Sequence, residues 1–305
     1  MHHDAAFEAT AESGGARHAF SLLWRDKFAL AAALFLLVVA LCAIFGPWLV
    51  ADTASAINLR ARNLPPFSLE RGWFYVLGAD ALGRSMVARL IVGSQNTLAV
   101  AGAAVLLAMA IGAALGLVAG YKGGWLSNLI LRLADIVLSF PSLLLALIVL
   151  YALGASVANV ILVLAVTRIP LYLRTARAEV LEIRERVYVS AARVLGARPR
   201  RLIWRHIAPA TLPTLINLAT LDFAAVMLSE SSLSFLGLGM QPPEVSWGLM
   251  VAEGQDYLST AWWLSFWPGL AITLTAMSAN LLANWVSIVS DPVQRWRLEA
   301  RATHG

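Results

Sequence analysis

Residues 174–213 read RTARAEVLEIRERVYVSAARVLGARPRRLIWRHIAPATLP and separate two long apolar stretches of the chain. Residues 174–205 alone hold nine arginines and three glutamates. Positively charged loops are retained on the cytoplasmic side during membrane insertion. We therefore expect this stretch to be a cytoplasmic loop between two membrane spans.

The apolar stretches on both sides of this loop are long enough to cross a bilayer. The chain is 59% hydrophobic and 13% charged, with a mean hydropathy of +0.72, which is typical of a membrane protein. A bilayer core about 30 Å thick needs roughly 20 apolar residues per helix. Candidate spans cover residues 28–51, 90–121, 136–167, 207–229 and 257–290. The third is too long for one crossing and is expected to break at residues 154–156, so the sequence predicts an all-α protein with six transmembrane helices.

Six crossings with residues 174–210 inside the cell place both termini in the cytoplasm. The predicted organisation is a cytoplasmic tail (1–27), a first transmembrane helix (28–51), an external loop (52–95), a five-helix core with the cytoplasmic loop (96–290), and a second cytoplasmic tail (291–305).

The distribution of charge outside the central loop supports this orientation with one exception. Basic residues precede the first helix at Arg17, Arg25 and Lys27. Residues 212–294 contain no lysine or arginine, and the loop between the last two spans carries the acids Glu244, Glu253 and Asp256. The exception is the first external loop, in which residues 52–89 hold five arginines against three acids.

Small and aromatic residues predict how the spans pack and where they end. Small residues recur every four positions along the second helix, at Ala104, Ala108, Gly112, Gly116 and Gly120. This spacing lets another helix approach closely. Three tryptophans open the last helix at Trp262, Trp263 and Trp267, and we expect them to anchor it at the membrane interface.

The central loop has a helical pattern of its own. Apolar residues recur at helical spacing at Val180, Ile183, Val187, Ala191 and Val194. This pattern predicts one surface helix with an apolar side, on which Glu182 and Arg186 pair at positions i and i+4.

Glycine and proline predict the end of that surface helix. Gly196 permits a left-handed turn, and Pro199 can open a second short helix. Pro209 and Pro213 are expected to end the unit before the fifth span. From these features alone, the loop could also bind anionic lipid or simply satisfy the positive-inside rule.

Ser190-Ala191-Ala192, followed by Gly196 and Pro209, resembles the Glu-Ala-Ala loop of permease subunits in binding-protein-dependent ABC importers. This chain has Ser190 where that family usually has glutamate, and His206 and Ala208 where it has apolar residues. In the family, the loop docks on the ATPase subunit. The resemblance therefore implies that Ser190, Ala191, Ala192, Gly196 and Pro209 contact such a subunit.

Further stretches are similar to the peptide/nickel branch of these permeases. They are residues 77–84 (LGADALGR), 132–141, 230–239 (ESSLSFLGLG), 241–243 (QPP), 246–248 (SWG) and Asp291-Pro292. Within this branch the chain looks like the C-type subunit of a heterodimeric pair. The resemblance implies a bacterial inner-membrane location and a peptide or similar small solute as cargo. It also implies three kinds of partner, namely a second homologous permease subunit, two ATP-binding subunits and an external substrate-binding protein.

Catalytic chemistry has little support in the sequence. An ATPase needs a phosphate loop ending in Gly-Lys-Ser/Thr, and neither Lys27 nor Lys122 belongs to one. Of the five histidines only His206 lies away from the chain ends, and Cys42 is the sole cysteine, so no metal-ligand cluster or disulfide is expected. We expect no cofactor, no nucleic-acid partner and no enzymatic activity on this chain.

Charged residues in or beside the spans are candidates for the translocation path. They are Asp135, Arg168, Asp222 and Glu230. Asp222 and Glu230 lie eight residues apart and thus share a helix face, roughly 12 Å apart along the axis. That face is expected to point into the bundle, toward water or a partner such as Arg168. Whether these acids line a path or fix helix packing stays open at this stage.

Two other classes of function compete with the importer hypothesis. An ion- or proton-coupled secondary transporter would use the intramembrane acids, but such carriers usually show inverted repeats, and none is evident in the sequence. A membrane scaffold without transport would leave those acids and the long external loop without a role.

The predicted orientation can be tested by thiol labelling. With Cys42 replaced by serine, single cysteines are placed at Glu244 and at Arg198 in turn. A membrane-impermeant reagent should label only position 244 in intact cells with a permeabilised outer membrane. Labelling at position 198 under the same conditions would overturn the orientation.

Overall fold

The computed structural model describes residues 23–24, 26–68 and 72–290. Regular structure in this part of the chain is helical, apart from an isolated bridge between Ala79 and Ser85. Arg17, Arg25, Asp291-Pro292 and the rest of the two tails lie outside the described residues. The cytoplasmic placement of the termini therefore stays a prediction.

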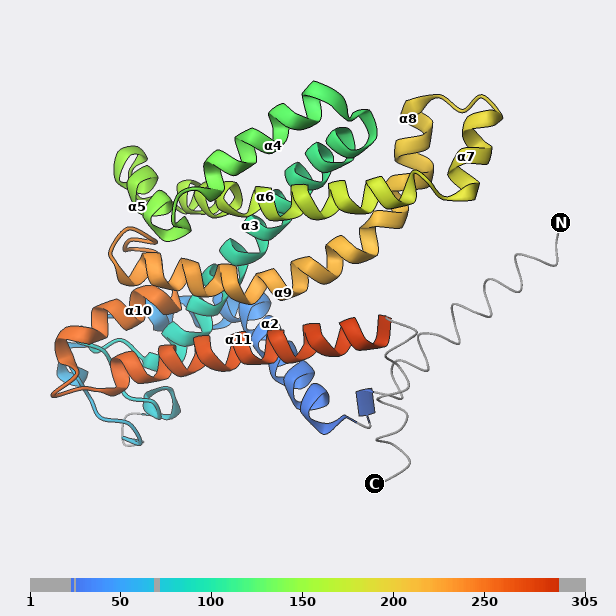
Figure 1. The fold of residues 1–305 in the computed structure, drawn as a ribbon. Coiled ribbons are helices and arrows are strands. Elements are labelled where there is room, and N and C mark those ends of the chain that lie inside the picture. The colour runs from blue at the N-terminus through green and yellow to red at the C-terminus, as the bar shows by residue number, and fades with distance from the viewer. Residues whose placement is uncertain (1–22, 25, 69–71, 291–305) are drawn as a thin grey trace.

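Five helices of the described chain are long and apolar enough to cross a membrane, and they match five of the predicted spans. They are α2 (Lys27–Ser55), α3 (Met86–Lys122), α6 (Val157–Ile183), α9 (Ala208–Phe235) and α11 (Trp263–Ser290). In Figure 1 the start of α2 and the end of α11 lie toward one end of the bundle, together with the central loop. The loop between α2 and α3 lies at the other end with α10 (Trp247–Gly254).

The third predicted span is not one straight helix. Helix α4 (Gly124–Leu138) and helix α5 (Ser142–Leu153) meet at an angle of 86°, and only the pair together can count as a sixth crossing. Pro141 explains the break, because proline disfavours the α conformation in the residue before it and cannot continue the hydrogen-bond ladder. The twelve residues of α5 extend about 18 Å, which is too short for a bilayer core.

The small-residue stripe of α3 packs against α6, as the spacing predicts. Ala104 and Ala108 are fully buried, and the three glycines meet the partner backbone directly. A methyl group at Gly116 would lie 2.6 Å from the Leu173 carbonyl oxygen, and one at Gly112 would lie 2.8 Å from that of Ile169. Only glycine therefore permits this approach. Of the described helices, α3 and α6 share the most extensive contact.

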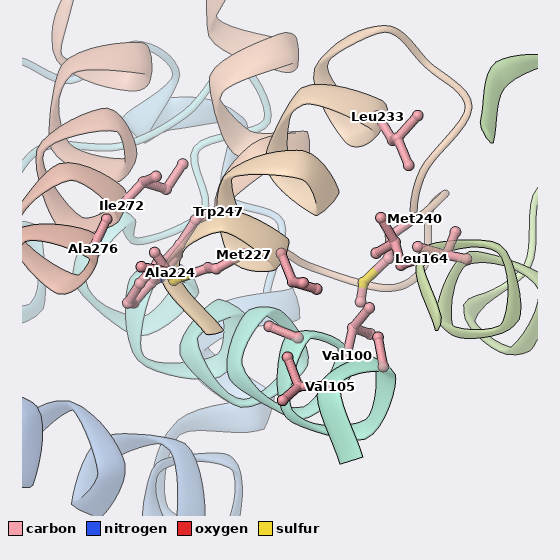
Figure 2. Packing of buried hydrophobic residues seen from close by; sticks show 14 of the residues in the cluster. Val100, Val105, Leu164, Ala224, Met227, Leu233, Met240, Trp247, Ile272 and Ala276 are labelled. Carbon is pink, nitrogen blue, oxygen red and sulfur yellow. The ribbon is translucent and has the colours of Figure 1, made fainter. Parts of the chain in front are cut away.

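The main hydrophobic core forms where α3, α6, α9, α10 and α11 meet. Figure 2 shows Val100 of α3 on the same side of the cluster as Leu164 of α6, whereas Met227 of α9 and Ile272 of α11 lie on the other side. Trp247 of α10 joins them and donates from its indole N–H to the Leu90 carbonyl, 2.9 Å away. The short helix α10 is thus part of the core rather than a surface loop.

The tryptophans at the start of α11 have different roles. Trp262 is half exposed, as an interfacial anchor should be. Trp263 is buried, and its indole N–H donates to the Ala79 carbonyl at 3.2 Å. The prediction that Trp263 is a membrane anchor is therefore wrong. It joins α11 to the loop between α2 and α3, a long-range contact that the spacing of the tryptophans does not reveal.

Adding one methyl group at two glycines of α3 should have opposite effects. At Gly116, alanine would clash with α6, and we expect a loss of about 1–3 kcal/mol of stability. At Gly102, the nearest atom to the new methyl group is 3.9 Å away, so alanine should be neutral or stabilise the helix by up to about 1 kcal/mol. Thermal unfolding of the purified chain in detergent measures both. Equal midpoints for the two variants would refute the close packing.

Candidate functional sites

The central loop consists of two short helices at the end of α6. Helix α6 stops at Ile183, α7 spans Val187–Val194, and α8 spans Pro199–Leu202. The predicted single surface helix is therefore wrong. The chain turns at residues 184–186, which separates Val180 and Ile183 from the apolar residues that follow. Arg186 donates to Glu182 at 2.8 Å, so the predicted ion pair is confirmed but spans the turn instead of stabilising one helix.

Glycine and proline form the second turn as predicted. Gly196 adopts a positive φ of +84° after α7, and its N–H bonds to the Arg193 carbonyl at 3.1 Å. Arg198 is extended, and Pro199 occupies the first turn of α8, where its missing N–H has no cost. A methyl group at Gly196 would meet nothing within 4 Å, so glycine is needed there for backbone conformation and not for space.

The prolines after the loop do not end the helical unit, contrary to the prediction. Helix runs continuously from Pro199 to Phe235, through a π-helical turn at Ile203–Ile207. This wider turn stands directly before Pro209, which then occupies the first turn of α9. A widened turn relieves the clash and the missing donor that proline brings to a helix interior. Helix α8 is therefore joined to the long apolar helix α9 without a break.

Helix α7 presents an apolar face that no other part of the described chain covers. Val187, Val194 and Leu195 are each between 86% and 88% exposed. Ala191 and Gly196 lie exposed between them, while Ser190 and Ala192 are half-buried. The predicted docking residues of α7 and its turn thus lie together. Pro209 does not share this face, because it lies at the start of α9.

A small core under the loop fixes α7 to the membrane helices. It consists of Leu117, Val180, Ile183, Val189, Leu202 and Ile207. These residues come from α3, α6, α7, α8 and the π-helical turn. In addition, Arg184 donates to the Gly120 carbonyl at 3.1 Å, directly at the close contact between α3 and α6. The loop is therefore packed against α3 and α6.

Asp222 lies between α6 and α9 with two partners. The Tyr172 hydroxyl donates to its carboxylate at 3.1 Å, and Arg168 Nε lies 3.5 Å from the other oxygen. The predicted partnership of Asp222 with Arg168 is therefore confirmed. Tyr172 was missed by the sequence analysis, although it lies four residues after Arg168 on the same face of α6.

Glu230 lies in a separate buried site near the end of α9. Its side chain is fully buried, and the Ser234 and Ser231 hydroxyls donate to it at 2.7 Å and 3.3 Å. The Ser234 oxygen also accepts from the Met240 N–H, and a methyl group at Gly248 would lie 2.6 Å from Ser231 Cα. The run at residues 230–239 thus packs the end of α9 tightly against α10.

Asp135 lies apart from these two acids. It forms an ion pair with Arg174, which joins α4 to α6, and both side chains are more than half exposed. The four path candidates therefore form three groups: Asp222 with Arg168, Glu230 with its serines, and Asp135 with Arg174.

A largely buried charge network near the loop between α2 and α3 was not predicted. Arg89 of α3 lies 2.7 Å from both Asp80 and Glu253, and its side chain is 3% exposed. Arg84 adds a 2.6 Å contact to Asp80. These residues border a cavity of about 320 Å³. The run LGADALGR at residues 77–84 contains two members of the network, Asp80 and Arg84. Glu253, the acid that completes it, lies far along the sequence.

The network pairs part of the positive charge of residues 52–89, which were predicted to form an external loop. Two of the five arginines there, Arg84 and Arg89, form ion pairs with Asp80 and Glu253. Removing one partner of a buried charge pair costs several kcal/mol, so the network holds the loop between α2 and α3 against α10.

Comparison with protein families finds two matches. Residues 112–295 match the model described as "binding-protein-dependent transport system inner membrane component". Residues 16–66 match the "N-terminal TM domain of oligopeptide transport permease C". Together the two matches include α2, most of the helical core and the whole central loop.

Curated relatives are similar over most of their length. The Probable D,D-dipeptide transport system permease protein DdpC of Escherichia coli K12 is 40% identical over 89% of this chain and 90% of its own. The di/tripeptide transport system permease protein DppC of Pseudomonas aeruginosa is 38% identical, over 88% of each chain. The glutathione transport system permease protein GsiD of Escherichia coli O6:K15:H31 is 38% identical over 88% and 87%.

Proposed function

The chain belongs to the family of binding-protein-dependent transport system inner membrane components, and from this premise we propose that it forms half of the translocation pathway of an ATP-driven peptide importer. Its five long apolar helices and the bent α4–α5 pair supply the membrane part of such a pathway. ATP hydrolysis takes place on separate subunits, and this chain converts their movement into a rearrangement of its helices.

Short peptides are the proposed cargo. The three relatives described above are permease proteins of D,D-dipeptide, di/tripeptide and glutathione transport systems, and all three names describe small peptides. An external binding protein delivers the peptide to the end of the bundle where α10 and the buried charge network lie. A second, homologous permease subunit completes the pathway.

The exposed face of α7 is the observation that carries the proposed mechanism. Ala191 and Gly196 have almost no side chain, so a groove on an ATP-binding subunit can approach the backbone closely. The surrounding Val187, Val194 and Leu195 supply apolar area at the rim. Ala192 packs against the small core below this face, and Ser190 is half-buried beside it. Pro209 contributes indirectly, because it sets the start of α9.

Two helices can carry the movement of α7 into the membrane. Helix α6 leads from the loop to Arg168 and Tyr172, and α9 leads from α8 to their partner Asp222. A displacement of the loop would therefore shift both sides of this contact. We propose that Asp222 and Arg168 border the translocation path, that Glu230 fixes the external end of α9, and that Asp135 with Arg174 holds α4 against α6.

The competing hypothesis of an ion- or proton-coupled carrier has less support. Such a carrier needs an intramembrane acid that can bind and release its ion. Asp222 already has a cationic partner, and Glu230 is enclosed by serine hydroxyls without exposure. Both environments suit fixed structural charges better than exchange with solvent.

Replacing Gly196 by valine should uncouple the importer. A β-branched residue at a positive φ costs about 1–3 kcal/mol, which corresponds to a loss of roughly 5- to 150-fold in docking. We expect less ATP-binding subunit to co-purify with the tagged chain and peptide uptake to fall, while the amount of inserted chain persists. Gly196→Asn should retain most activity, because asparagine tolerates this conformation.

Gly123→Val is the matched control for this prediction. Gly123 joins α3 to α4, also has a positive φ (+64°), and also has open space around its Cβ position. It lies outside the docking face, so its backbone strain should leave co-purification unchanged. If the unaltered chain brings down no ATP-binding subunit and moves peptide when reconstituted alone, the importer proposal fails. Normal co-purification and uptake by the Gly196 variant would remove only the docking role.

Neutral replacements separate a path role from a packing role for the buried acids. Glu230→Gln should lower the abundance of the assembled complex and reduce uptake of all peptides alike, because it disturbs the enclosed serine site. Asp222→Asn should leave abundance near normal and change uptake according to peptide charge. Immunoblotting and uptake of cationic, neutral and anionic dipeptides measure these effects. If both variants assemble and transport every peptide at the parental rate, both assignments are wrong.

A further inference from the structure

A groove lined by arginines lies beside the proposed docking face but does not belong to it. It has a volume of about 650 Å³, and its lining residues are Arg198, Arg200, Arg201, Trp204, Arg205 and Pro209. No acidic side chain lines it, and residues 186–221 contain no aspartate or glutamate. No ion pair of the described chain neutralises any of the four arginines. The groove therefore favours an anion.

The groove lies at the start of a continuous helix, Pro199–Phe235, that is long and apolar enough to cross a membrane. In Figure 1, α7 lies at the outer edge of the loop, whereas α8 runs directly into α9. The groove follows this second path, from Arg198 at the start of α8 to Pro209 in the first turn of α9. A partner bound to the apolar tip at Val194 and Leu195 would lie farther from the bundle than the arginines.

An exposed apolar strip continues from the groove along α9. Leu212 and Ile216 follow Pro209 at spacings of three and four residues, so all three lie on one side of the helix. Leu212 and Ile216 are each 47% exposed. Trp204, 63% exposed, lies on the groove wall, and tryptophan favours the boundary between headgroups and acyl chains. A cationic site thus adjoins an aromatic residue and an apolar strip.

We propose that this groove binds an anionic phospholipid of the cytoplasmic leaflet. The arginine guanidinium groups donate to the phosphate oxygens of the headgroup, for which their planar, multiple N–H groups are suited. The acyl chains lie along Leu212 and Ile216. A zwitterionic phospholipid offers the same phosphate but no net charge, and it binds less well. Bound lipid fixes the depth of α8 in the membrane while α7 stays free to engage its protein partner.

This site is independent of the docking proposal, and its test uses different residues. The assembled importer is reconstituted into nanodiscs that contain brominated phosphatidylglycerol or brominated phosphatidylcholine, because bromine quenches nearby tryptophan. The contribution of Trp204 is the difference between the unaltered chain and Trp204→Phe. We expect this contribution to be quenched preferentially by phosphatidylglycerol.

Single arginine variants test the headgroup contact. Arg201→Gln and Arg205→Gln should each lower the preference for phosphatidylglycerol about fivefold. Arg193→Gln is the matched control, because Arg193 is an exposed arginine of α7 that does not line the groove. It removes the same charge from the same loop and should leave the preference unchanged. Because all three side chains are exposed, the variants should keep the fold, which size-exclusion chromatography verifies.

Four outcomes would overturn the proposal. Equal quenching by the two lipids would mean contact with the membrane without headgroup recognition. An equal effect of Arg193→Gln would mean diffuse attraction to the membrane surface. Loss of the preference in millimolar inorganic phosphate would identify a site for the free anion. Absence of quenching by either lipid in the assembled importer would assign the groove to a protein contact.

Discussion

The close approach of α3 and α6 is the contact on which the remaining arrangement depends. Three glycines of α3 allow the backbone of α6 to pack without intervening side chains, and Gly120 lies beside both Val180 and the guanidinium of Arg184. The same helix α6 carries Tyr172 and Arg168 toward Asp222 and ends in the central loop. A shift at this contact would therefore displace the proposed docking face together with Arg168 and Tyr172.

Buried polar groups make the two ends of α9 different from each other. At the C-terminal end, Glu230 and its serines fix the helix to α10, and the nearby network of Arg89, Asp80 and Glu253 fixes α10 to the loop between α2 and α3. At the N-terminal end, the π-helical turn before Pro209 joins α9 to α8 without interruption. This arrangement suits a helix that is held at one end and moved at the other.

Charge on this chain has three separate roles that a count of arginines does not distinguish. Arg84 and Arg89 pair with Asp80 and support the fold of the loop between α2 and α3. Arg168 and Arg174 join α6 to neighbouring helices. The arginines of α8 and the π-helical turn have no acidic partner in the described chain and face outward. Of these three groups, the last is the one without an ion pair in the described chain.

The sequence by itself determined the class of the fold and most of its spans, because apolar length and the retention of positive loops act locally along the chain. It also determined the turn at Gly196 and the packing face of α3, since both depend on the size or conformation of single residues. The tertiary structure decided what depends on distant neighbours. Pro209 stays within a helix because a wide turn precedes it, Trp263 is buried because the loop between α2 and α3 packs on it, and Arg89 pairs with Glu253 far along the chain. Val187 and Val194 match a buried helical stripe in sequence, yet they project outward because the chain turns at residues 184–186. The spacing of the apolar residues does not indicate this turn.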